Sequence, residues 1–376
     1  MPEVRRNTLL HLPSDMPAPR TTHWDEDDED DGPPRIRKRW YHYLPLFLAV
    51  LLMLLPHPSL LLVLVNYHLR VLDSPARFLI HLLVTYTLSF LAFCSLILIL
   101  ARDPGPVTSP KAAEAAEDVD EREDMGFMQA LLATESDGPH DKRPGKWCRK
   151  CSAPKPERTH HCSTCGRCVL KMDHHCFWLG DRCVGHRTYS AFIHLLTCIV
   201  LLSVYIAVLC IQAVYFAFTN PLAIDESTPL HDIYLAFYGI IMALVFGSFW
   251  MYHIYLTTTN QTTLENVSPF LLLRHLPPLP RPSSGTQILS DPPLEHQLSH
   301  AQRRLVRDAH FHVRIYDVGW RKNWAQVMGW DQPWGWANRL LVGGGCKGDG
   351  QAFPRNSRAD DMLTRLAHDL VSIDKD

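Results

Sequence analysis

Seven of the eleven cysteines in this 376-residue chain lie between Cys148 and Cys183, together with four histidines. This segment carries one pattern twice, with the second copy fourteen residues after the first and its last interval one residue longer. Zinc takes four thiolate or imidazole ligands in a closed structural site and tolerates irregular loops between them. The spacing therefore predicts two structural zinc ions, one bound by Cys148, Cys151, His161 and Cys168, and the other by Cys162, Cys165, His175 and Cys183.

One cysteine of the segment, Cys176, is left without a metal. It closes the run Asp173, His174, His175, Cys176. A thiol beside a histidine and an aspartate, on a backbone fixed by two metals, has the parts of an activated nucleophile. The alternative is that Cys176 binds zinc and another cysteine is spare, but the repeat disfavours it. The sequence therefore separates eight metal ligands from one reactive thiol.

Long apolar blocks predict a membrane protein. There are four of them, at Leu44–Val65, Phe78–Ala101, Ala191–Phe216 and Ile233–Leu256. About 20 apolar residues are needed for a helix to cross the hydrocarbon core. Pro56, His57 and Pro58 interrupt the first block, so it is expected to be either a kinked span or partly re-entrant. The fold class is then an α-helical polytopic membrane protein with four transmembrane helices and a cytosolic two-zinc cysteine-rich domain between spans 2 and 3.

Basic residues predict the orientation. Arg35, Arg37, Lys38 and Arg39 precede the first block, and residues 102–187 are rich in lysine and arginine, whereas residues 218–232 have neither. Positively charged loops stay in the cytosol, so both ends and the cysteine cluster are expected there. A reducing compartment also keeps thiols free for zinc or catalysis. The organelle remains open among Golgi, endoplasmic reticulum, vacuole and plasma membrane, and with a net charge of −2 no nucleic acid is expected as a partner.

Composition divides the chain into seven segments. They are a disordered tail (1–39), spans 1 and 2 with Asp103, Pro104 and Gly105 (40–106), a cytosolic linker with one short helix around 126–133 (107–144), the zinc domain (145–188), spans 3 and 4 (189–258), a polar element with a proline-rich linker (259–300), and a cytosolic C-terminal region (301–376). In the last segment, the aromatic and basic stretch 303–330 is expected to form a small module near the membrane, and 331–376 show little pattern.

The stretch from Cys148 to Gly185 resembles the cysteine-rich domain of the DHHC family of protein S-acyltransferases, the palmitoyltransferases, and in particular its fungal-type members. Three short elements support the resemblance: Asp103-Pro104-Gly105 is similar to the family's DPG motif, Thr262-Thr263-Leu264-Glu265 to its TTxE motif, and Asn323 to Gly329 to its NxxxxxG element. They stand in the family's order relative to the spans. The resemblance covers roughly residues 40–330.

The resemblance implies an enzyme that transfers a long-chain acyl group from palmitoyl-CoA to cysteines of cytosolic-face proteins through an acyl-enzyme thioester. A thiol with a pKa near ~8.5 is only a few per cent thiolate at neutral pH. Cys176 would therefore be the nucleophile, His174 its base and Asp173 the residue that orients the base. The resemblance also implies that the acyl chain stays in the bilayer and that the CoA phosphates contact Lys155, Arg158 and His160. It places Thr262, Thr263 and Glu265 near Asp173. Asn323 is expected to form a hydrogen bond at a helix end.

Departures from the family pattern cluster after Cys176. Phe177 replaces the usual proline, the interval to Cys183 is one residue longer, and Thr188 stands where the family has asparagine. Gly180 is expected to absorb the extra residue with a positive φ. The effect on rate stays open, as do the protein substrates, the chain-length preference and the oligomeric state. One alternative is therefore a catalytically weak relative that acts as a membrane scaffold or as the partner of an active acyltransferase.

A second alternative is a membrane-anchored RING-type ubiquitin ligase, which also uses crossed zinc sites. It fits poorly, because the two copies here span under forty residues and leave a surplus thiol.

Overall fold

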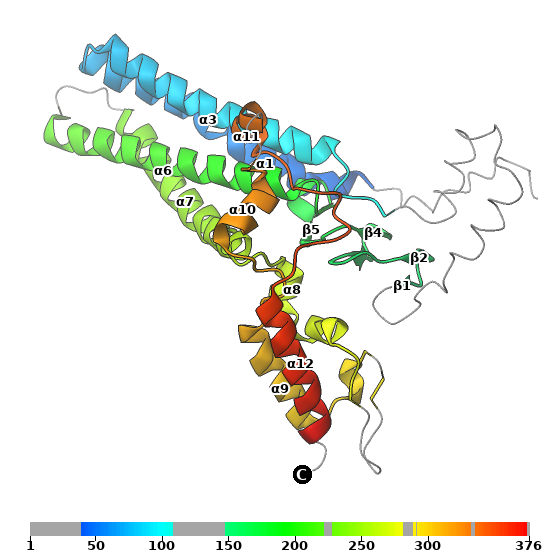
Figure 1. The fold of residues 1–376 in the computed structure, drawn as a ribbon. Helices are drawn as coiled ribbons and strands as arrows, with labels where there is room; N and C mark the ends of the chain where they lie inside the picture. Colours follow the sequence, from blue (N-terminus) through cyan, green and yellow to red (C-terminus); the bar gives the residue numbers. More distant parts are fainter. Residues whose placement is uncertain are drawn as a thin grey trace, which may run out of the picture. The chain divides into compact units, whose positions relative to one another are not determined.

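The computed structural model describes residues 39–107, 147–221, 228–280, 289–290, 292–331 and 335–373. The predicted N-terminal tail and the linker of residues 107–144, with its short helix, lie outside these ranges, except for residues 39 and 107. The protein is mostly helical (Figure 1), with short strands confined to the cysteine-rich segment.

Four helical segments are long and apolar enough to cross a membrane: Trp40–Val71, Pro75–Ala101, Tyr189–Thr219 and Thr228–Thr258. The first joins η1 (Trp40–Tyr43), α1 (Leu44–Leu54), α2 (Pro56–Val63) and the π-helical turn η2 (Leu64–Val71), and the others are α3 (Pro75–Ala101), α6 (Tyr189–Thr219) and α7 (Thr228–Thr258). Helix α6 packs against both α3 and α7 (Figure 1). The prediction of four spans is confirmed, and each segment extends a few residues beyond its apolar block.

The proline break in the first span is repaired by a neighbouring helix. Pro56 has no N–H, so the carbonyl of Leu52, four residues back, loses its usual helical donor. The hydroxyl of Tyr238 on α7 donates to that carbonyl oxygen at 2.5 Å. A freed backbone group inside a bilayer must find another partner, and here it does. The first segment therefore continues as one helical run of 32 residues instead of turning back.

The cysteine-rich segment folds into three two-stranded antiparallel hairpins, which lie between α3 and α6 in the chain. The pairs are β1 (Trp147–Cys148) with β2 (Ala153–Pro154), β3 (His160–Cys162) with β4 (Arg167–Val169), and β5 (His174–Cys176) with β6 (Arg182–Val184). In the second hairpin His161 stands opposite Cys168, and in the third His175 stands opposite Cys183. The sequence repeat is therefore also a structural repeat.

The DPG element fastens this segment to the end of α3. Leu170 N–H donates to the carbonyl of Gly105 at 3.0 Å, and Arg187 N–H donates to the carbonyl of Pro104 at 3.1 Å. Gly105 has a φ of 131°, and a Cβ there would lie 3.0 Å from that of Leu170. Only glycine tolerates both the conformation and the close approach.

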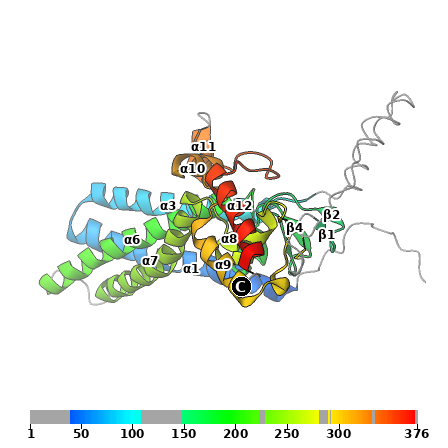
Figure 2. The ribbon, with the colours of Figure 1, turned by 60° about the horizontal axis from the view of Figure 1, so that its bottom comes forward.

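The C-terminal region is more ordered than its composition predicts. Among the described residues after the fourth span, from 259 on, there are seven helical elements: α8 (Thr263–Val267), η5 (Pro269–His275), η6 (Glu295–Gln297), α9 (His300–His312), α10 (Trp320–Met328), α11 (Trp336–Val342) and α12 (Ser357–Ser372). The predicted proline-rich linker begins as η5, whose Leu272 and Leu273 are buried against α9 and α12. Figure 2 shows α9 and α12 side by side.

The predicted module of residues 303–330 is divided between two places. Helix α9 packs on α12 and η5, whereas α10 packs on α7 and α6. Helix α12 lies within residues 331–376, for which no structure is predicted from the sequence, and it buries Leu363, Leu366 and Leu370 on one face. An amphipathic helix of this kind is stable only against a partner, and α9 is that partner.

Candidate active site and metal sites

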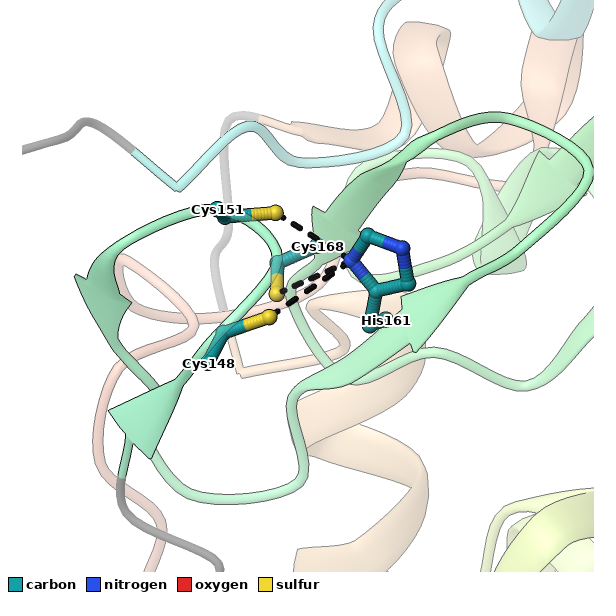
Figure 3. A group of neighbouring side chains, drawn as sticks. All are labelled: Cys148, Cys151, His161 and Cys168. Carbon is teal, nitrogen blue, oxygen red and sulfur yellow. Dashed lines mark hydrogen bonds between the residues drawn. The ribbon is translucent and has the colours of Figure 1, made fainter. Parts of the chain in front are cut away.

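The first predicted ligand set converges on one point (Figure 3). The Nδ1 atom of His161 lies 3.5, 3.1 and 4.0 Å from the sulfur atoms of Cys148, Cys151 and Cys168. A tetrahedral zinc ion with bonds of ~2.0–2.3 Å separates its ligand atoms by ~3.5–3.8 Å. The four side chains therefore fit a closed zinc site with no position for water or substrate.

The second ligand set has the same geometry. The Nδ1 atom of His175 lies 3.5, 3.4 and 3.6 Å from the sulfur atoms of Cys162, Cys165 and Cys183. Nε2 of His175 hydrogen-bonds to Asp181 Oδ1 at 2.7 Å. Carboxylates commonly orient metal-binding histidines in this way, so both sets are compatible with zinc.

Asp181 is a residue that sequence reasoning missed. It lies in the longer interval before Cys183, where Gly180 has a φ of 69° and Asp181 one of 59°. The prediction of a positive φ at Gly180 is confirmed. The only signal in the sequence is an aspartate between two zinc-site residues, His175 and Cys183. In the structure, the left-handed conformation of both Gly180 and Asp181 turns the Asp181 side chain toward His175. The turn at Gly180 and Asp181 therefore brings a hydrogen-bond acceptor to a metal ligand.

Cys176 belongs to neither ligand set. It ends β5, is half-buried, and stands two residues after His174, whose pKa it helps to raise. His174 Nδ1 in turn lies 2.7 Å from Asp173 Oδ2. Burial acts to lower the pKa of His174, but the hydrogen bonds with Asp173 and Cys176 outweigh it and raise the pKa to about 9. An imidazole of this kind can hold a proton taken from the thiol.

Asp173 is 1% exposed and is held by an element ninety residues later in the chain. Thr263 donates its backbone N–H to Asp173 Oδ1 at 2.9 Å and its hydroxyl to Oδ2 at 2.8 Å. Burial acts to raise the pKa of Asp173, but the hydrogen bonds from His174 and Thr263 lower it below its usual value. Thr262 and Glu265 form the capping box that begins α8 and so fixes Thr263 in place.

The structure gives Arg158 a different place from the one predicted. Its guanidinium donates to both carboxylate oxygens of Glu265, at 2.7 and 2.8 Å, and to Asn260 Oδ1 at 3.0 Å. Its side chain is 0% exposed and lies 4.3 Å from the centre of the Tyr316 ring. A phosphate contact for Arg158 does not fit, because its nitrogen atoms are all used inside the protein. The sequence could not show a partner 107 residues away.

Lys155 and His160, the other two residues predicted to meet phosphate, are half-buried. Burial, with Arg274 nearby, lowers the pKa of His160 to about 4. His160 is therefore uncharged at neutral pH, which weakens the case for it as a phosphate contact.

Two asparagines tie the C-terminal helices to the spans. Asn323 is fully buried, and its Nδ2 donates to the carbonyl of Thr258, the last residue of α7, at 2.7 Å. Asn260, which sequence reasoning missed, donates to Gln326 Oε1 at 2.9 Å and accepts from Arg158. The predicted helix-end role of Asn323 matches this placement.

These features define a class: helical proteins with four candidate membrane spans, and with two Cys₃His sets and a Cys-His-Asp group between spans 2 and 3. Residues 141–269 match the DHHC palmitoyltransferase family. The chain is 32% identical over 210 residues to "Probable protein S-acyltransferase 13" of Arabidopsis thaliana, a match that covers 54% of this chain and 67% of that one. The chain therefore belongs to the DHHC palmitoyltransferase family.

Other relatives match shorter parts of the chain. "Palmitoyltransferase pfa3" of Emericella nidulans is 41% identical over 128 residues, which cover 32% of this chain and 23% of that protein. "Palmitoyltransferase ZDHHC2" of Mus musculus is 37% identical over 120 residues, or 32% of each chain. The chain spans 63% of "Probable protein S-acyltransferase 15" of Arabidopsis thaliana, and so less than two thirds of the length of several relatives.

Proposed function

We propose that this protein is a protein S-palmitoyltransferase, with Cys176 as its nucleophile. One observation carries the proposal. Cys176 is the single cysteine of the segment 148–183 that lies outside both ligand sets, and it follows closely on His174, a histidine that Asp173 holds at 2.7 Å. The palmitoyltransferase and S-acyltransferase names of the relatives support the same chemistry.

The residues of the site account for both halves of the reaction. His174 takes the proton of the Cys176 thiol, and the thiolate attacks the thioester carbon of the acyl-CoA. The bond between that carbon and the CoA sulfur breaks, and the imidazolium gives its proton to the leaving CoA thiolate. In the second half, an acceptor cysteine gives its proton to His174, attacks the acyl-Cys176 thioester and regenerates the free thiol.

Two zinc ions bound by the Cys₃His sets would supply structure, because each closed set leaves no coordination position for substrate. The acyl chain of palmitoyl-CoA would remain at bilayer depth, where each buried methylene contributes ~0.8 kcal/mol. Lys155 and the uncharged His160 would then contact the CoA phosphates, whereas Arg158 would stay bound to Glu265. The acceptors would be cysteines of proteins at the cytosolic face, next to a cytosolic active site.

The test uses the purified full-length protein and an alkyne-tagged palmitoyl-CoA. We expect a covalent label that hydroxylamine releases, that Cys176→Ala abolishes and that Cys346→Ala, a matched half-buried cysteine outside both sets, keeps. Cys176→Ala should retain two zinc ions per chain. Cys183→Ala should lose about one and destabilise the domain, since a structural zinc contributes directly to folding.

A correctly folded wild-type protein that keeps both zinc ions but takes no label would instead favour the weak, scaffolding relative. The observation in favour of that second function is Phe177, which is 54% exposed beside Cys176 where the family has proline. A loss of one zinc in Cys176→Ala would contradict the ligand assignment itself.

A further inference from the structure

His253 is a buried polar residue with no role in the reaction as described so far. It lies near the end of α7 and is 0% exposed. One of its ring nitrogens lies within 4.8 Å of the Asp173 carboxylate and of the His174 imidazole. Its Nδ1 is 3.2 Å from the hydroxyl of Tyr189, whereas its Nε2 has no hydrogen-bond partner within the described ranges.

The surroundings of His253 are otherwise aromatic. Its ring centre lies 5.0 Å from that of Phe192 and 4.6 Å from that of Phe249, both edge-on, and Phe192 also contacts His174. A polar group in such a place costs free energy unless it is hydrogen-bonded. If packing were the only requirement at this position, phenylalanine would meet it without that cost.

Asp173 offers the matching acceptor. An ionised carboxylate can accept about four hydrogen bonds, and the described residues give Asp173 three: two from Thr263 and one from His174. One lone pair of a carboxylate that is 1% exposed is thus available. No direct hydrogen bond joins His253 to Asp173, but a separation within 4.8 Å suits a single water that makes two bonds of about 2.8 Å.

We infer that His253 is a positioning residue for acyl transfer, joined through one buried water to the fourth lone pair of Asp173. Tyr189 donates its O–H to Nδ1, so the neutral ring carries its proton on Nε2 and donates it to the water. The water donates to Asp173. Together with Thr263, this fixes the plane of the carboxylate, and the carboxylate fixes the His174 ring so that its other nitrogen faces Cys176.

This inference rests on the proposed function, and two variants test it. His253→Phe keeps the ring volume and removes both nitrogens, whereas His253→Gln restores a side-chain donor. We expect His253→Phe to lower the kcat of acyl-enzyme formation roughly tenfold with little change in the KM for palmitoyl-CoA, because only the orientation of the base is disturbed. His253→Gln should recover part of the rate. A His253→Phe enzyme with wild-type kcat would overturn the inference.

Tyr189→Phe provides a second route that does not depend on His253→Phe folding. It should lower kcat in the wild-type background and have no further effect in a His253→Phe background, since both changes disable the same connection. Additive effects of the two changes would contradict the connection. The variants are compared only at a zinc content of two per chain, which checks that the domain is folded.

The readouts separate this inference from the proposed function. If wild type takes no thioester label, the proposed function fails. If wild type is labelled and His253→Phe matches it, only the inference fails. A third zinc per wild-type chain that is lost in His253→Phe would also overturn it, because Asp173, His174 and His253 would then be a metal site.

Discussion

At the scale of single residues, the reactivity of Cys176 depends on how Asp173 is held. Thr263 supplies two of the three hydrogen bonds that the described residues give to this buried carboxylate. Hydrogen bonds to charged groups are the stronger ones. The TTxE element therefore reaches Cys176, the proposed nucleophile, only indirectly, through Asp173 and His174.

Thr263→Val tests this connection, because it removes the hydroxyl and keeps the backbone donor. We expect the rate of thioester labelling to fall roughly tenfold or more, since a hydrogen bond to a charged group is worth about 1.5–3 kcal/mol. Thr263→Ser is the matched control and should stay near wild type. An unchanged rate in Thr263→Val would show that the hydroxyl bond to Asp173 does not matter for catalysis.

Sequence spacing predicts the metal-ligand sets well, because four donors around one ion impose regular intervals. It cannot predict the partners of Arg158 or the role of Asp181. The first depends on a glutamate 107 residues away, and the second on two successive left-handed residues. Its charge and the family resemblance indicated a phosphate contact for Arg158, whereas its burial against Glu265 follows from the tertiary fold.

The buried pair of Arg158 and Glu265 joins the zinc domain to α8. Removing one member of a buried ion pair typically costs about 3–5 kcal/mol, because the other charge is left without a partner. We therefore expect Arg158→Gln to lower the thermal unfolding midpoint sharply, and Arg158→Met combined with Glu265→Leu to recover much of the loss.

Lys155→Gln is the matched contrast to these changes. It should leave the unfolding midpoint near wild type and raise the KM for palmitoyl-CoA instead. If Arg158→Gln instead raises the KM for palmitoyl-CoA without a loss of stability, Arg158 contacts the CoA phosphates and the structural role is wrong.

At the scale of elements, the first span depends on a contact from the fourth. Tyr238 donates to the Leu52 carbonyl that Pro56 leaves free. Tyr238→Phe should therefore destabilise the wild-type protein by about 0.6 kcal/mol, a typical value for one hydrogen bond between membrane helices.

In a Pro56→Ala background, residue 56 regains the N–H that can bond to Leu52. The effect of Tyr238→Phe should then shrink toward zero. Unfolding of the four variants in detergent would measure this double-mutant cycle, and equal effects in both backgrounds would rule out the repair of the break by Tyr238.

Hydropathy was enough to predict the four spans, because a bilayer demands long apolar helices. Hydropathy does not predict the structure of the chain after the fourth span. Leu272 and Leu273 lie in a proline-rich stretch whose composition predicts a linker, but they complete an apolar cluster with α9 and α12. That cluster depends on contacts between segments about ninety residues apart, and local composition does not report them.

At the scale of the whole molecule, the orientation across the membrane is open to a direct test. Asn260 and Asn266 each begin a glycosylation acceptor pattern, which is used only on the lumenal side. With four spans and a cytosolic N-terminus, both asparagines follow the fourth span on the cytosolic side, so neither should carry glycan. Glycosidase treatment of membranes should leave the mobility unchanged. A mobility shift that Asn260→Gln or Asn266→Gln removes would reverse the proposed orientation.

The contact between Thr263 and Asp173 also means that the site can be completed only late in the synthesis of the protein. The cysteine-rich segment leaves the ribosome ninety residues before Thr263, and spans 3 and 4 lie between them. At about 5–20 residues per second, roughly 5–20 s pass between the synthesis of the nucleophile and that of the group that holds its aspartate. During this interval Cys176 can already lie beside folded metal sites, but Asp173 does not yet have its two hydrogen bonds from Thr263. If Cys176 is the nucleophile, as proposed, a chain that stalls before Thr263 is made is therefore expected to be less reactive than the complete protein.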